Sequence, residues 1–143
     1  MELRTFGAAL KFALDLEAIA AAFYESAMGI ATSQELKGLF ESLLLRGQKR
    51  IDLLLRVRRE NTTEMILEPI SGLDGDQYHP KTEIPVGTGD AALAKLAESL
   101  EQKIHAFYKG AAEKISFLSE PAEIFERLAD ENAENAKRLQ AVL

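Results

Sequence analysis

Cysteine and tryptophan are absent from this chain of 143 residues, and its only two histidines are His79 and His105. The lack of cysteine excludes disulfides, thiolate catalysis, iron–sulfur clusters and cysteine-ligated zinc sites. Two histidines cannot supply any site that needs several imidazoles. The chemistry open to this chain therefore depends on carboxylates, amides and hydroxyl groups.

Clusters of positive charge and long apolar runs are also missing. The net charge is −6 and the basic residues are scattered, which argues against a nucleic acid or an anionic membrane as partner. No stretch approaches the roughly 18 apolar residues of a membrane-spanning helix. Charges at Glu2 and Arg4 interrupt the first ten residues, so we expect no secretory signal and a cytoplasmic location.

Apolar residues recur at the 3.6-residue helical period over four long segments. These predict helices at about 5–31, 33–59, 90–117 and 120–142, within a single all-α domain spanning 1–143. Thr5 is the expected N-cap of the first helix and Asp90 that of the third. Thr32 and Glu35 have the spacing of a capping box at the start of the second helix.

The periodicity fails over about 60–89, where three prolines and four glycines interrupt the chain. A short extended piece is expected at 65–67. The links within each helix pair are short, which predicts two antiparallel hairpins. The long middle segment is then a crossover that joins one hairpin to the other.

The two hairpins resemble each other in sequence. Residues Glu17–Tyr24 match Glu101–Tyr108 at an offset of 84 residues, and each segment starts with Glu and ends with Phe-Tyr. Residues Leu39–Leu43 match Ile124–Leu128 at an offset of 85. One residue of slippage in the turn between the helices reconciles the two offsets. The pattern indicates an internal duplication of a helical hairpin.

With Glu before Phe-Tyr on the first and third helices, and the Leu-Phe pattern on the second and fourth, the chain resembles the rubrerythrin branch of the ferritin-like superfamily. The resemblance spans all four helices and leaves the crossover unmatched. It implies a ferritin-like four-helix bundle whose core holds two metal ions, di-iron or di-manganese. The ligands in that family are one Glu from each of two helices and a Glu-x-x-His from each of the other two.

Only part of that ligand set is present here. The resemblance places the two single glutamates at Glu17 and Glu101, which are retained. The two Glu-x-x-His motifs fall on Gly47–Arg50 and Asn132–Asn135, so both further carboxylates and both imidazoles are replaced. Two of six ligands remain, and we expect no metal cofactor. Glu17 and Glu101 would be the ligands if any metal were bound.

Helical spacing predicts that these six positions face the core. Glu17 and Glu101 lie within the apolar stripes of their helices, and Arg50 lies in line with Leu43 and Leu54. Two buried carboxylates repel each other and require a nearby cation. We expect Arg50 to bridge or neighbour both glutamates, and Asn132 and Asn135 to complete a vestigial core site. The alternative is that Arg50 extends into solvent and the glutamates are partly solvated.

Several other groups are candidates for roles around this cluster. Tyr24 and Tyr108 can hydrogen-bond the carboxylates, and His105 lies one turn after Glu101, within reach as a nitrogen ligand. Other carboxylates that would have to rescue metal binding are Glu41, Asp130, Glu131 and Glu134. Glu131 and Glu134 are about 100° from the core line of their helix, which favours a solvated face for both.

The second helix is apolar on more than its core face, because it contains three consecutive leucines at 43–45 and again at 53–55. A helix of this kind is covered on both sides. The cover is either the apolar part of the crossover or a second subunit. We expect a homodimer formed through this helix.

These observations support three functions to different degrees. The leading hypothesis is a non-catalytic bundle that acts as a binding or oligomeric module of unknown partner. The second, implied by the resemblance, is a di-iron or di-manganese oxidoreductase that reduces peroxide. The chain lacks the cysteine-ligated electron-transfer module that such enzymes append. The third is a protein that binds an apolar ligand inside the bundle.

Overall fold

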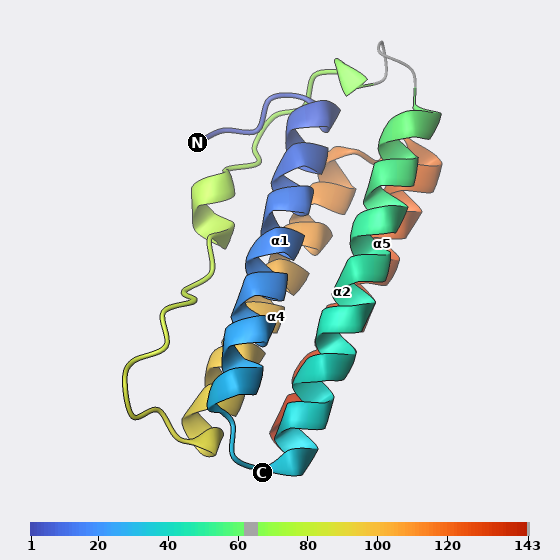
Figure 1. Cartoon of the computed structure of the whole chain (residues 1–143). Coiled ribbons are helices and arrows are strands. Elements are labelled where there is room, and N and C mark those ends of the chain that lie inside the picture. The colour runs from blue at the N-terminus through green and yellow to red at the C-terminus, as the bar shows by residue number, and fades with distance from the viewer. Residues whose placement is uncertain (62–65, 143) are drawn as a thin grey trace.

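Four long helices packed as two hairpins form a bundle in the computed structural model, which describes residues 1–61 and 66–142. In chain order, the helices are α1 (Phe6–Ile30), α2 (Gln34–Glu60), the short 3₁₀ helix η1 (Gly75–Tyr78), α4 (Asp90–Lys114) and α5 (Ser119–Ala141). Helix α1 pairs with α2, and α4 pairs with α5. The second hairpin lies behind the first in Figure 1, with α4 against α1 and α5 against α2.

The first two helices begin at side chains that cap their free N–H groups. The hydroxyl oxygen of Thr5 accepts from the backbone N–H of Ala8 at 3.0 Å, as the sequence predicts. The predicted capping box of Thr32 and Glu35 is wrong. The N-cap of α2 is Ser33, whose hydroxyl accepts from Leu36 N. Asn61 ends α2 by donating its side-chain and backbone N–H groups to the carbonyl of Val57.

Asp90 caps a different helix from the one predicted. The N-cap of α4 is Gly89, and the carboxylate of Asp90 accepts from the backbone N–H groups of Thr32 and Ser33 at 2.9 and 2.8 Å. The hydroxyl of Thr32 also donates to it. Hydrogen bonds from Thr32 and Ser33 N–H lower the pKa of Asp90. A negative charge beside the N-terminus of α2 also complements the helix dipole, so Asp90 joins the two hairpins at one end of the bundle.

The crossover runs the length of the bundle along α1 and α4 (Figure 1). Its first described part pairs with the N-terminal residues: Leu3 N donates to Leu73 O, and Ile70 N donates to Arg4 O. The extended piece expected at 65–67 begins outside the described residues, and Ile66 and Leu67 are in a helical turn. The next part forms η1, which packs on α4.

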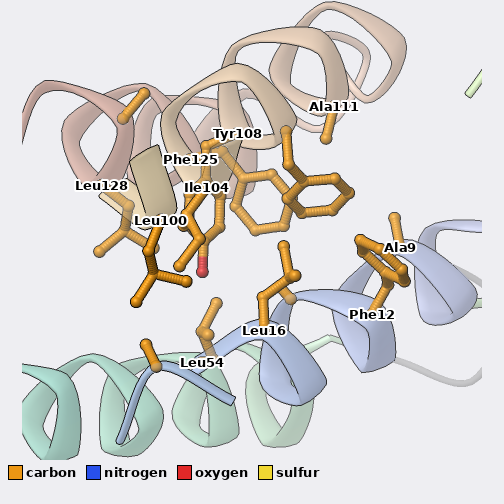
Figure 2. Packing of buried hydrophobic residues seen from close by; sticks show 14 of the residues in the cluster. Ala9, Phe12, Leu16, Leu54, Leu100, Ile104, Tyr108, Ala111, Phe125 and Leu128 are labelled. Carbon is orange, nitrogen blue, oxygen red and sulfur yellow. The ribbon is translucent and has the colours of Figure 1, made fainter. Parts of the chain in front are cut away.

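Small residues allow the helices to pack closely. Ala9, Ala13, Ala97, Ala111 and Ala129 are completely buried. Larger side chains then fill the space between helices, and Figure 2 shows aliphatic and aromatic side chains from facing helices in contact. None of the helices in the described ranges is long and apolar enough to cross a bilayer.

The outer face of α2 remains outside this core. Ile51 and Leu55 are half-buried and Leu45 is 54% exposed, whereas Leu44 packs against the core. The crossover does not cover this face of α2, since residues 66–89 follow α1 and α4 instead. In the described part of α2, Leu45 is the one exposed large apolar side chain, among mostly charged and polar neighbours.

Candidate functional site: a buried polar cluster

Five polar residues lie inside the bundle, and they are the only buried polar or charged residues in the described part of the chain. Each of the four long helices contributes at least one. We call them the polar cluster: Glu17, Arg50, Glu101, Asn132 and Asn135. The sixth position of interest, Gly47, lines a small cavity beside them.

Arg50 pairs directly with Glu17. Its Nε donates to both carboxylate oxygens of Glu17 at 3.2 and 3.1 Å, and one terminal nitrogen donates to Glu17 Oε2 at 2.9 Å. Arg50 is only 6% exposed. The alternative in which this side chain extends into solvent is therefore wrong. The guanidinium carbon also lies 5.3 Å from the centre of the Tyr108 ring, within the range of a cation–π contact.

The remaining N–H groups of Arg50 are satisfied by α5. One terminal nitrogen donates to the backbone carbonyl of Leu128 at 3.1 Å and to the carboxylate of Glu131 at 3.3 Å. The other donates to Asn132 Oδ1 at 2.8 Å. These bonds tie α2 to α5 through a single side chain.

Glu101 has amide and hydroxyl donors but no direct cation. Its Oε1 accepts from the Nδ2 groups of Asn132 and Asn135 at 3.0 and 2.9 Å. Its Oε2 accepts from the hydroxyl of Tyr24 at 2.7 Å. Arg50 reaches Glu101 only through Asn132, so the expectation that Arg50 bridges the two glutamates holds for Glu17 directly and for Glu101 as a neighbour.

The different surroundings have different effects on protonation. Burial raises the pKa of Glu101, although the hydrogen bonds from Tyr24 and Asn135 and the charge of Arg50 act against this. For Arg50, burial works to lower the pKa, but the nearby charge of Glu17 outweighs it and the pKa is raised. Burial raises the pKa of Tyr24 and Tyr108 well above the usual value, helped by Glu101 and Glu17 respectively. Both phenols therefore keep their protons and donate hydrogen bonds to the carboxylates.

The contacts of the two hairpins mirror each other. Tyr24 of α1 donates to Glu101 of α4, and Tyr108 of α4 donates to Glu17 of α1 at 2.6 Å. Arg50 and Asn135 occupy equivalent positions, 85 residues apart. Arg50 donates to Glu17 in the first hairpin, and Asn135 donates to Glu101 in the second. The cluster therefore has an approximate two-fold symmetry.

The other candidate ligands, apart from Glu131, do not contact the cluster. His105 is half-buried, and its Nδ1 bonds to the carbonyl oxygen of Ala129 at 2.8 Å, so this nitrogen carries the proton and the ring is held at the interface of α4 and α5. All four carboxylates considered for metal rescue are exposed: Glu41, Asp130, Glu131 and Glu134. Glu131, at 54% exposure, nevertheless accepts from Arg50, a contact that helical geometry alone did not predict.

The residues of the cluster do not suit a pair of metal ions. In residues 1–61 and 66–142, no group of three or more Asp, Glu, His or Cys side chains is placed to hold a metal ion. The lone pairs of both glutamates are largely used by donors, and the guanidinium puts positive charge next to them. Divalent iron or manganese needs several anionic or imidazole ligands to compete with water.

Comparisons of this chain with protein-family models, with curated proteins and with solved structures gave no match.

Proposed function

We propose that this chain is a ferritin-like, rubrerythrin-related bundle in which an arginine and two amides replace the metal ions of the core. It acts as a non-catalytic binding or oligomeric module. The observation that carries the proposal is the ion pair of Arg50 and Glu17, with both partners more than nine-tenths buried. This pair supplies internally the positive charge that buried carboxylates require.

The mirrored hydrogen bonds support descent from a duplicated hairpin. A bundle made of two similar hairpins has equivalent inward positions at the same depth on each half. Here those positions still carry a glutamate and a tyrosine on both halves, at 17 and 24 and at 101 and 108. The polar positions on α2 and α5 differ from each other, which is the pattern expected when selection for a common ligand set has been lost.

The proposal is tested by metal analysis of the purified protein, grown with added iron and manganese. We expect less than about 0.1 metal ion per chain, because two carboxylates that already accept hydrogen bonds cannot displace water from a divalent metal ion. Near-stoichiometric iron or manganese would contradict the proposal and favour the di-metal oxidoreductase.

A gain-of-function variant tests the correspondence of positions. The variant Gly47→Glu, Arg50→His, Asn132→Glu, Asn135→His restores the family ligand set around Glu17 and Glu101. We expect it to bind close to two ferrous ions per folded chain, measured by titration and by optical spectra. The matched control, Gly38→Glu, Lys49→His, Arg127→Glu, Lys137→His, places the same four side chains at exposed positions of the same helices and should bind no more than the parent chain.

The oligomeric part of the proposal concerns the hairpin of α1 and α2. The half-buried Ile51 and Leu55 and the exposed Leu45 supply apolar side chains on α2. Branched apolar side chains of this kind suit the packing of two helical hairpins across a two-fold axis. A second copy of this chain is the partner that we propose for it.

A further inference from the structure

A small cavity lies inside the bundle beside Gly47 on α2. Its volume is about 20 Å³, and its lining includes Glu17, Glu101 and Asn135. A Cβ atom placed on Gly47 would meet no atom within 4 Å beyond its own helical backbone. One water molecule needs about 10–15 Å³, so the cavity has room for one and not for a larger ligand.

Asn135, which lines this cavity, has one buried polar atom without a hydrogen-bond partner in the described part of the chain. Asn135 is 4% exposed, and its Nδ2 donates to the carboxylate of Glu101. A carboxylate can only accept here, so the orientation of the amide is fixed and Oδ1 must point away from Glu101. In the described part of the chain, Asn135 Oδ1 accepts no hydrogen bond. A buried carbonyl oxygen of this kind is destabilising unless something donates to it.

The approximate symmetry of the cluster shows which side chain is missing at this place. Asn132 lies between the two halves, where it accepts from Arg50 and donates to Glu101. At the offset of 85, the equivalent of Asn132 on α2 is Gly47, which has no side chain. The link that would join Asn135 to Glu17 on the other half is missing. Glu17 Oε1 accepts only the Nε group of Arg50, at 3.2 Å, and can accept another bond.

We propose that the cavity at Gly47 binds a single water molecule, which donates one hydrogen bond to Asn135 Oδ1 and the other to the carboxylate of Glu17. The water takes the place of the side chain that Gly47 lacks. It completes the polar cluster, because one water molecule at position 47 contacts Glu17 directly and Asn135, the partner of Glu101.

The direct test is a crystal structure of the unmodified chain at a resolution that shows ordered water. We expect one water oxygen within about 3.2 Å of Asn135 Oδ1, bordered by Gly47. In solution, the same water should give cross-relaxation with the amide protons of the Asn135 side chain. A cavity without density, or one filled by the side chain of Arg46, would overturn the proposal.

Variants at Gly47 test it independently, with Gly38 as the matched control. Gly38 lies on the same helix, is exposed, and also has no neighbour within 4 Å of a Cβ position. At Gly38, Leu should give a higher melting temperature than Asn, because leucine is the better helix former. At Gly47 the order should reverse, since Gly47→Asn can donate to Asn135 Oδ1 and Gly47→Leu expels the water without replacing its bonds. The same order at both positions would contradict the proposal.

An ammonium ion has the same size and also donates, so it has to be distinguished from water. The melting temperature is measured in ammonium chloride and in sodium chloride at equal ionic strength. Equal values support water. A melting temperature that rises with ammonium alone, and does so in the parent chain but not in Gly47→Leu, would overturn the assignment to water.

Discussion

Arg50 has an acceptor for every one of its five N–H groups, although it lies in the middle of a helical bundle. Two carboxylates, one amide and one backbone carbonyl provide them. The geometry matters because desolvating a guanidinium costs several kcal/mol and is offset only when all its donors are bound. Such a network stabilises the fold as a unit and is sensitive to the loss of any one member.

Replacing Arg50 by Met should strongly destabilise the protein, since Glu17 would remain as a buried charge without a cation. We expect a loss of about 3–5 kcal/mol in the free energy of unfolding, measured by denaturant titration. Lys49→Met, which removes the neighbouring exposed cation, should change it by less than about 0.5 kcal/mol. Adding Glu17→Gln to Arg50→Met should recover part of the loss. A loss below about 1 kcal/mol for Arg50→Met would show that the ion pair is not needed.

Glu101 gives a pH dependence of opposite sign to that of an ordinary salt bridge. Its pKa is raised in the folded chain by burial, above the reference value of 4.5. A raised pKa means that its contribution to stability is complete below the unfolded value and is lost as pH rises through the folded value. Glu101→Gln should therefore be more stable than the parent chain at pH 7 and should lose this advantage towards pH 4.

The measurement is denaturant unfolding at several pH values between 4 and 8. Glu113→Gln, an exposed change on the same helix, controls for the loss of one negative charge. If Glu101→Gln were less stable than the parent chain across the whole range, ionised Glu101 would be the favoured form.

Helical periodicity was sufficient to identify the residues of the polar cluster, because position along a helix determines which side chains share a face. It also placed Tyr24 and Tyr108 where their hydroxyls reach the carboxylates. It did not predict the two contacts of Arg50 with Leu128 and Glu131. A backbone carbonyl has no signal in the sequence, and a long glutamate side chain can bend towards the core from an exposed position.

At the scale of the elements, the helices and the Thr5 cap agree with the sequence pattern, while the other two predicted caps do not. Helices α1 and α2 begin and end within one or two residues of the predicted bounds, and α4 ends at Lys114, about three residues early. The wrong assignments are those of Thr32 and Asp90. Capping motifs describe neighbours in sequence, but Asp90 reaches α2 from 58 residues away, through the packing of the two hairpins.

Ser33 is therefore the local determinant of where α2 starts. Ser33→Ala removes the side-chain acceptor for Leu36 N, and we expect the free energy of unfolding to fall by about 1 kcal/mol. Glu35→Ala tests the capping box that the structure contradicts, and should have a smaller effect. Thermal or denaturant unfolding of both variants decides between the two caps. A larger loss for Glu35→Ala than for Ser33→Ala would restore the capping box.

At the scale of the whole molecule, the path of the crossover could not be predicted. The segment has no periodic apolar pattern, and its position depends on pairing with the N-terminal residues, as in the bonds between Leu3 and Leu73. That pairing joins parts of the chain that are far apart in sequence. Because the crossover lies along α1 and α4, it does not cover the outer face of α2, where Leu45 is exposed.

The proposed homodimer makes Leu45 the residue to change, since it is 54% exposed on that face. In the parent chain, sedimentation equilibrium should give twice the monomer mass at micromolar concentration. Leu45→Glu should give the monomer mass, because two glutamates would face each other or be desolvated near the two-fold axis.

Val86→Glu is the control, since Val86 is fully exposed on the crossover, and it should remain dimeric. Circular dichroism of each variant separates loss of association from loss of folding. A parent chain that stays monomeric, or a Leu45→Glu variant that stays dimeric, would exclude this face as the interface. In the second case the next surface to test is the groove between α1 and the crossover, where Ile19, Ile30 and Ile84 are incompletely covered.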